Sequence, residues 1–351
     1  MNHSSLNRAL LDWFDQYGRK HLPWQEQRTP YRVWVSEIML QQTQVATVIP
    51  YYERFMARFP TVAELARADE DSVLHLWTGL GYYARARNLH ATAKRVQQEY
   101  GGHFPASVDA LSALPGIGLS TAGAIMALGH GEFAVILDGN VKRVLTRLHC
   151  LEGWPDQPKV QAQLWRLAEA LTPRERCADY TQAIMDLGAT LCSRGKPACG
   201  LCPLKDSCEA YQQGRTAEFP QRKPSKTLPV KRTYMLLLHD YARGRVLLEK
   251  RPPQGIWGGL WSFPESEDIS GFNIERHGQL LIDLRAVQPW HTLRHTFSHF
   301  HLDITPVQIP LDAHLVSINE GERFHWYDLK TPSTLGLAAP VKKLLQKLAQ
   351  L

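Results

Sequence analysis

Two acidic residues stand in surroundings that predict opposite charge states for their carboxyl groups. Glu37 lies in an apolar stretch, with Trp34 three residues before it and Gln41 four residues after it on one helix face. Loss of water there raises the pKa of a carboxyl group, which can then hold a proton near neutral pH. Asp138 precedes a predicted helix over 141–148, whose first amides would stabilise an ionised carboxylate. Together they would supply an acid and a stabiliser of positive charge. Taken singly, Asp138 could be a plain helix cap and Glu37 one polar position on an apolar helix.

Four of the six cysteines share one short segment. They follow the spacing C-x6-C-x2-C-x5-C: Cys192, Cys199, Cys202 and Cys208. Four thiolates within 17 residues can surround one soft metal centre. Structural zinc sites usually contain two close cysteine pairs, and only one CxxC is present here, so the spacing favours an iron–sulfur cluster over zinc. Cys150 lies outside this group on the apolar face of a predicted helix, where core packing is the simpler interpretation.

A glycine-containing turn precedes Asp138. Residues 114–118 read LPGIG, and Gly116 and Gly118 lack the Cβ atom that would restrict their backbone angles and keep another chain at a distance. Amides at the start of the following helix would point outward, as suits a phosphate oxygen. The stretch from about 106 to 128 therefore predicts a helix-hairpin-helix, although an ordinary turn between two core helices would have similar glycines.

The elements that position these residues are mostly helical up to residue 213. Apolar residues recur at spacings of three and four, and strand-like alternation is nearly absent. This periodicity predicts helices over residues 6–14, 31–49, 62–76, 84–97, 106–114, 119–128, 141–148 and 160–171.

The character of the chain changes after residue 213. Residues 214–232 hold three prolines, six Lys/Arg and one acid, and are predicted to be an extended, basic linker. Thr233–His239 and Arg245–Arg251 are predicted strands, Leu293–Ile309 alternates as a strand does, and 339–350 fits an amphipathic helix. We therefore expect a helical domain over 1–213, the linker, and an α+β domain over 233–351.

The length and net charge of the chain limit the number of domains and the kinds of partner that can be expected. The chain has 351 residues, enough for two domains, with 44% apolar and 21% charged residues. Its net charge of +6 favours a polyanionic partner, but only weakly. The N-terminus lacks the apolar core of a signal peptide, and no apolar stretch approaches the roughly 20 residues that span a bilayer. We expect a cytoplasmic, chromosome-associated protein with reduced thiols and no membrane partner.

The hairpin and the cysteine loop together resemble the helix-hairpin-helix DNA glycosylases. In that family LPG-x-G is followed, 20 residues after its second glycine, by a catalytic Asp, and Gly118 and Asp138 have this separation. The cysteine spacing resembles the family's [4Fe–4S] loop, which lies at the C-terminal end of the helical domain. The resemblance implies a structural [4Fe–4S] cluster and cleavage of an N-glycosidic bond, whose transition state has oxocarbenium character.

Further stretches closely resemble the MutY-type adenine DNA glycosylases, over nearly the whole chain. These are Leu22–Trp24, Glu37–Gln44 and Gly79–Arg87. The resemblance implies double-stranded DNA as the partner, and removal of adenine mispaired with 8-oxoguanine or guanine after the base is flipped out. A monomer is expected.

The same resemblance implies roles for individual residues. Gln42 and Tyr82 would insert beside the lesion and fill the base stack. Trp24 and Leu40 would wall the adenine pocket, although core packing is equally plausible for Leu40. Asn140 and Arg143 would orient or neutralise Asp138. The implied contacts to DNA or bases are Trp24, Leu40, Gln41, Gln42, Tyr82, Gly116, Gly118 and Ser120.

Ser120 distinguishes two kinds of glycosylase. Bifunctional relatives of the endonuclease III kind carry a Lys two residues after the second hairpin glycine, and that Lys attacks the sugar as a Schiff-base nucleophile. Serine cannot form an iminium, so the resemblance implies a monofunctional enzyme that leaves an abasic site. Lys142 lies close to Asp138 in the sequence, and its amine is an alternative nucleophile that could give weak lyase activity.

The second domain resembles a Nudix-like fold in residues 255–265, GIWGGLWSFPE. Residues 266–290 contain no run of glutamates of the kind that binds divalent metal in Nudix hydrolases. The domain is therefore expected to recognise 8-oxoguanine, through Phe297, Ser298 and His299, with Ser298 contacting the oxidised base. His291, His295, His299 and His301 fit a metal site poorly, because strand alternation separates them.

Three other functions remain open at this point. A bifunctional pyrimidine glycosylase with lyase activity is disfavoured by Ser120 and by the second domain. A non-catalytic DNA-damage binding protein is disfavoured by the intact Glu37 and Asp138. A nucleotide-pool hydrolase acting through 233–351 is disfavoured by the missing glutamates.

Overall fold

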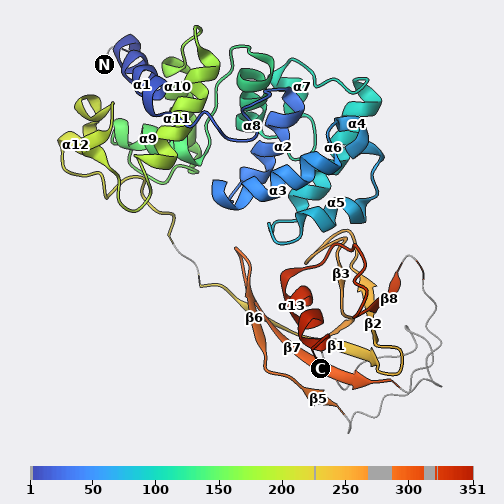
Figure 1. The fold of residues 1–351 in the computed structure, drawn as a ribbon. Coiled ribbons are helices and arrows are strands. Elements are labelled where there is room, and N and C mark those ends of the chain that lie inside the picture. Colours follow the sequence, from blue (N-terminus) through green and yellow to red (C-terminus); the bar gives the residue numbers. More distant parts are fainter. Residues whose placement is uncertain (1–2, 225–226, 268–286, 312–320, 322, 351) are drawn as a thin grey trace. The chain divides into compact units, whose positions relative to one another are not determined.

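The computed structural model describes residues 3–224, 227–267, 287–311, 321 and 323–350. Backbone contacts divide the chain into two compact units. Unit 1 comprises Met1–Arg67 and Asn88–Pro224, and unit 2 comprises Ala68–Arg87 and Ser225–Leu351. The units are unlike in kind, since helices make up unit 1 and a sheet dominates unit 2 (Figure 1).

Unit 1 is built from helices, as the periodicity predicts. Helix α6 (Ala84–Glu99) begins in unit 2 and continues into unit 1. The others are α1 (His3–Tyr17), α2 (Pro30–Leu40), α3 (Val45–Arg58), α4 (Val62–Arg67), α7 (Val108–Ser112), α8 (Leu119–Ala124), the π-helix η1 (Ile125–His130), α9 (Gly139–Leu148), α10 (Pro158–Leu171), α11 (Cys177–Thr190), the short 3₁₀ turns η2 (Cys199–Leu201) and η3 (Lys205–Ser207), and α12 (Glu209–Gln212).

Helix α2 lies in the centre of unit 1. It begins at Pro30, where the Thr29 hydroxyl caps the helix by accepting a hydrogen bond from the Arg32 amide. Trp34 and Met39 are fully buried, and α2 packs against α3, α8 and η1. Because α2 is buried on several faces, Glu37 on this helix lies in surroundings of low polarity.

The single helix predicted over 31–49 is wrong. The structure has α2 and α3, separated by a turn in which Gln42 has a φ of +57°. That left-handed conformation cannot continue a right-handed helix. The helix predicted over 62–76 is likewise divided, because Asp69 caps a new helix, α5 (Glu70–Trp77), by accepting from the Ser72 amide.

Helix α11 was not predicted. Its polar residues Thr181, Gln182 and Asp186 are buried along with its apolar ones, so the sequence lacks an amphipathic period. The Asp186 carboxylate, which is fully buried, receives the Arg19 guanidinium at 2.6 Å and 2.9 Å. This paired contact joins α11 to the chain after α1.

Unit 2 contains one mixed sheet. Strand β1 pairs in parallel with β7, while β2 pairs antiparallel with β1, β3 and β8. The strands are β1 (Val230–Asp240), β2 (Arg245–Lys250), β3 (Trp261–Ser262), β4 (Glu265–Ser266), β5 (Gln288–Pro289), β6 (Leu293–Thr296), β7 (His301–Pro310) and β8 (Phe324–Asp328), with helices α5 and α13 (Ala339–Leu348) in the same unit.

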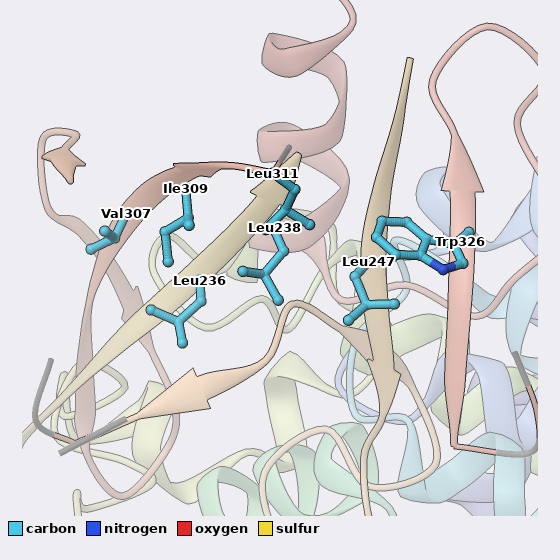
Figure 2. Packing of buried hydrophobic residues seen from close by; sticks show 7 residues of the cluster. All are labelled: Leu236, Leu238, Leu247, Val307, Ile309, Leu311 and Trp326. Atoms are coloured by element: carbon cyan, nitrogen blue, oxygen red, sulfur yellow. The ribbon is translucent and has the colours of Figure 1, made fainter. Parts of the chain in front are cut away.

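One face of this sheet carries an apolar cluster (Figure 2). Alternate residues on β1 and β7 point to the same side, because successive strand side chains face opposite ways. The cluster consists of Leu236, Leu238, Leu247, Val307, Ile309, Leu311 and Trp326. The strands predicted over 233–239 and 245–251, and the helix over 339–350, are confirmed to within a few residues.

Residues 68–87 are attached to this sheet by side-chain hydrogen bonds. The Asp71 carboxylate receives Lys250 Nζ at 2.9 Å and Trp261 Nε1 at 3.1 Å. The Tyr83 hydroxyl donates to the Leu337 carbonyl at 2.8 Å. A segment predicted within the helical domain therefore belongs, by its contacts, to the compact unit that holds the sheet.

Two predicted extended segments differ from the structure. Leu293–Ile309 is not one strand but the hairpin β6–β7, with residues 297–300 at its tip. Within the predicted linker, the Phe219 side chain is buried, and its carbonyl accepts from Arg147 Nε at 2.9 Å. The composition of residues 214–232 does not reveal this attachment to unit 1, because it depends on burial of a single aromatic side chain in an otherwise basic segment. The domain boundaries at 213 and 233 stay predictions.

No helix among the described residues is long and apolar enough to cross a membrane.

Candidate active site

Glu37 lies on α2 and is half-buried, between the buried Ser36 and Ile38. Burial, and next the nearby charge of Asp138, raise the pKa of Glu37 to about 8. The direction predicted from its apolar neighbours is therefore confirmed. Glu37 and Asp138 are 101 residues apart in the sequence, yet the charge of Asp138 is close enough to disfavour ionisation of Glu37.

Asp138 caps helix α9. Its carboxylate accepts the Val141 amide at 2.8 Å and Asn140 Nδ2 at 2.9 Å. Burial nevertheless raises the pKa of Asp138, and these hydrogen bonds only oppose that rise. The low pKa predicted from the helix start was wrong in direction, because desolvation by the surrounding elements outweighs the capping amides.

Asn140 and Arg143 extend the network around Asp138. The Asn140 side-chain oxygen accepts from Arg143 Nη2 at 2.8 Å, and the same guanidinium donates to the carbonyls of Gly188 and Cys192 at 2.6 Å and 2.7 Å. Helix α9 packs closely on α11 here, since a Cβ on Gly188 would lie 2.6 Å from Asn140 Cβ. Asn140 thus contacts Asp138 directly, and Arg143 holds Asn140 in place.

The four cysteines of the predicted cluster loop lie between α11 and α12. Burial, and to a smaller degree the other three thiols, raise the pKa of Cys202 to about 12, so the other three lie within electrostatic reach of Cys202. Cys192 Sγ also accepts from Arg147 Nη1 at 3.2 Å. Among the described residues, no group of three or more His, Cys, Asp or Glu side chains is arranged to hold a metal ion.

The hairpin has the geometry predicted for 106–128. Gly116 has a φ of +75°, and a Cβ there would lie 2.8 Å from Asn88 Cβ, so a side chain would be strained and crowded. Gly118 is the N-cap residue of α8 and is exposed, as is Leu119, the first residue of the helix. The first amides of α8 therefore lie at the surface of unit 1, where a phosphate could reach them.

Ser120 has an internal role that its sequence position did not suggest. Its hydroxyl accepts the Leu137 amide at 3.0 Å, which joins α8 to the residue before Asp138. Gly123 supports the same contact, because a Cβ there would lie 2.1 Å from the Val135 carbonyl oxygen. The second helix of the hairpin thus packs directly against the segment that leads to Asp138.

The residues implied as pocket walls have different environments. Trp24 is buried and packs edge-on against Tyr52, with ring centroids 5.4 Å apart, so it is part of the core. Leu40 and Gln41 are half-buried at the end of α2, and Gln42 is exposed in the following turn.

Tyr82 belongs to unit 2. It has a φ of +49° and is 52% exposed, and the Arg85 guanidinium carbon lies 5.5 Å from its ring centroid. A large aromatic side chain held in the left-handed region at the surface is uncommon, and such residues concentrate at functional positions.

Residues 297–300 form the tip of the β6–β7 hairpin. The Phe297 amide donates to the Phe300 carbonyl at 2.9 Å, which closes the turn. Ser298 and His299 are exposed at its end, and Ser298 Oγ lies 3.3 Å from His299 Nδ1. The three residues implied as the 8-oxoguanine contact are therefore adjacent on one turn.

Arg147 is the main residue that sequence analysis missed. It is 3% exposed on α9, and its guanidinium donates to Cys192 Sγ and to the carbonyls of Ser193 and Phe219. A signal was present, since Arg143 and Arg147 are four residues apart and so share a helix face.

Two family models match separate parts of the chain. The model of the HhH-GPD superfamily of base excision DNA repair proteins matches residues 35–170, and that of the NUDIX domain matches residues 233–347. A solved thermostable thymine-DNA glycosylase has a TM-score of 0.55 and 28% identity, covering 60% of this chain and 97% of its own. An endonuclease III–DNA complex, at 20% identity and a TM-score of 0.52, shares the fold over 61% of this chain and 98% of its own.

Curated relatives extend over nearly the whole chain. The adenine DNA glycosylase of Buchnera aphidicola subsp. Baizongia pistaciae is 39% identical over 344 residues, which cover 97% of this chain and 96% of the relative. The human adenine DNA glycosylase is 33% identical, with 96% of this chain and 73% of the relative covered. The chain therefore belongs to the adenine DNA glycosylase family.

Proposed function

We propose that this protein removes adenine from double-stranded DNA by hydrolysing its N-glycosidic bond, where the adenine is mispaired with 8-oxoguanine or guanine. The observation that carries the proposal is the buried Glu37 carboxyl group, which lies close enough to Asp138 to be affected by its charge. The pair lies inside the segment matched by the glycosylase family. The product would be an abasic site, since Ser120 cannot act as a Schiff-base nucleophile.

The surroundings of the two carboxyl groups decide which one holds a proton. Two nearby carboxylates cannot both ionise easily, so the pair retains one proton near neutral pH. The Val141 amide and Asn140 Nδ2 stabilise the charged form of Asp138. Burial and the charge of Asp138 both favour the neutral form of Glu37. The proton therefore resides on Glu37 and the negative charge on Asp138.

This distribution suits departure of a purine base. The Glu37 carboxyl donates its proton to N7 of a flipped adenine, which then leaves as a neutral base. The sugar becomes cationic as the bond breaks, and the Asp138 carboxylate stabilises that charge. Glu37, now ionised, accepts a proton from the water that attacks the sugar carbon, and this restores its starting state.

The cysteine loop would hold a [4Fe–4S] cluster through Cys192, Cys199, Cys202 and Cys208. The donor set fits such a group, because four thiols share one partly buried loop and a guanidinium donates to Cys192 Sγ. When bound, the cluster would fix the loop rather than take part in glycosidic cleavage. Arg143 joins this loop to Asn140 and hence to Asp138.

DNA would be held at the hairpin and read at two other places. The exposed α8 amides, together with a net charge of +6, suit phosphate oxygens. Gln42 and Tyr82, both exposed and both with positive φ, would enter the base stack as adenine is flipped. Ser298 at the hairpin tip of unit 2 would contact the opposing 8-oxoguanine.

Adenine release under single-turnover conditions tests this function. Duplexes with one adenine opposite 8-oxoguanine, guanine or thymine should give release with the first two and none with the third. Glu37→Gln and Asp138→Asn should each nearly abolish release while DNA binding persists, and Glu99→Gln, on the exposed face of α6, is the matched control. An active Glu37→Gln protein would overturn the assignment. Covalent trapping by borohydride would instead support the bifunctional lyase.

A further inference from the structure

The hairpin tip of unit 2 stands on a group of packed aromatic rings. Phe297 and Phe300 stack with centroids 4.6 Å apart and planes 25° apart, and His295 meets Phe297 edge-on at 4.6 Å. Burial, and next the charge of Lys343, lower the pKa of His295, which therefore packs as a neutral ring. The rings of the hairpin thus form a base beneath Ser298 and His299, both of which are exposed.

Trp257 joins this group from a different part of the chain. It lies between β2 and β3, is 7% exposed, and its ring centroid is 5.4 Å from that of His295 and 5.6 Å from that of Phe297. The indole is therefore a lateral support for the tip that comes from outside the β6–β7 hairpin.

The backbone around Trp257 is strained and tightly held. Trp257 has a φ of +52°, a conformation that costs a bulky residue free energy and persists only where the surroundings impose it. The Gly259 amide donates to the carbonyls of Arg251 and Pro252, both at 3.2 Å. A Cβ on Gly258 would lie 2.3 Å from the Pro253 carbonyl oxygen. This compact loop fixes the direction of the indole.

We propose that Trp257 is a positioning residue, which holds the Phe297–His299 tip in the geometry that distinguishes 8-oxoguanine from guanine opposite adenine. The inference rests on the proposed function. Trp257 itself is buried under the tip and need not touch DNA.

Precise positioning is needed because the chemical difference between 8-oxoguanine and guanine is small. 8-Oxoguanine and guanine differ by one oxygen and one hydrogen-bonding proton, so a hydroxyl such as that of Ser298 can discriminate only if it is held within a fraction of an ångström. A two-residue turn on a hairpin is mobile unless its base is packed. A single well-placed hydrogen bond corresponds to about tenfold in rate or affinity, and an unsupported tip would lose it.

Replacement of Trp257 by Leu or by Phe separates positioning from general stability. Leu removes the aromatic contacts, whereas Phe keeps a ring that can still meet Phe297. Trp326→Leu is the matched control, because Trp326 is equally buried in unit 2 but belongs to the apolar cluster of the sheet. All variants are prepared as full-length protein, and single-turnover adenine release is measured opposite 8-oxoguanine and opposite guanine.

The expected result concerns the ratio of the two rates. Trp257→Leu should lower release opposite 8-oxoguanine about tenfold while release opposite guanine stays nearly constant, so the ratio falls toward that of Ser298→Ala. Trp257→Phe should keep most of the ratio, and Trp326→Leu should leave it unchanged. The double variant with Ser298→Ala should lose no more than Ser298→Ala alone, since both changes remove one contact.

Other outcomes separate the inference from the function on which it rests. A Trp257→Leu protein with the parental ratio, or a Trp326→Leu protein with an equal loss, would overturn the inference and leave the function intact. If the unchanged protein released no adenine opposite either base, the proposed function would fail first. Equal release opposite both bases would overturn the inference and leave the proposed function intact. If Trp257→Leu does not fold, Trp257→Met, which keeps more volume, is expected to show the same fall in ratio and is subject to the same refutation.

Discussion

Replacement of Glu37 by glutamine should stabilise the protein at neutral to alkaline pH, even as it removes activity. Glutamine has nearly the shape of a protonated glutamate but cannot ionise. In the folded protein the pKa of Glu37 is raised from 4.5 to about 8 by burial and by the charge of Asp138. A carboxyl whose pKa is raised by folding favours the folded state below its unfolded value, and that contribution is lost as pH rises through the folded pKa.

The size of the effect follows from the two pKa values. Their separation corresponds to at most about 5 kcal/mol of lost stability at pH well above 8. Between pH 5 and pH 7.5 the stability of the unchanged protein should fall by about 3 kcal/mol relative to that of Glu37→Gln. That is a large part of the 5–15 kcal/mol that stabilises a typical domain.

Urea unfolding at a series of pH values measures this difference, with the helical signal of unit 1 followed by circular dichroism at 222 nm. Glu99→Gln is the control with the opposite sign. The Arg95 guanidinium lowers the pKa of the exposed Glu99 carboxyl, so that variant should lose a little stability as pH rises above the ordinary pKa of Glu. A stability difference between Glu37→Gln and the unchanged protein that stays flat from pH 5 to 7.5 would refute the argument that Glu37 is kept neutral by its surroundings.

Three further substitutions test the support of the site. Asp186→Ala should lower the free energy of unfolding by about 3 kcal/mol, because it leaves the Arg19 guanidinium without its buried partner, and urea midpoints measure this. Asn140→Ala should slow single-turnover adenine release by about 10- to 100-fold with little change in DNA affinity, because it removes one donor to Asp138; an unchanged rate would deny Asn140 that role. Gly116→Ala should weaken duplex binding in a titration, since alanine resists a φ of +75° there, and parental affinity would separate the turn from phosphate binding.

Much of the fold could be predicted from the sequence, and the departures have local physical causes. The spacing of apolar residues was sufficient to predict helix α10, which buries one face. A short continuous apolar run was sufficient to predict strand β1. It failed at Gln42, because a single left-handed residue divides a helix without changing the apolar pattern. It also failed at α11, because burial of that helix on most faces removes the period.

The electrostatics of the two carboxyl groups could be predicted only in part. The apolar neighbours of Glu37 on its own helix were enough to predict a raised pKa. For Asp138 the helix start was visible in the sequence, whereas the burial that outweighs it arises from contacts such as that between Ser120 and Leu137. Only the three-dimensional arrangement brings those elements together around the second carboxyl.

The most direct test of the central claim is the pH dependence of single-turnover adenine release from a duplex with adenine opposite 8-oxoguanine. If neutral Glu37 is the acid, the rate should be nearly constant from pH 6 to 7.5 and should fall about tenfold per pH unit once the pKa of about 8 is passed. A rate that continues to rise through pH 9 would contradict the claim that a protonated Glu37 starts the reaction.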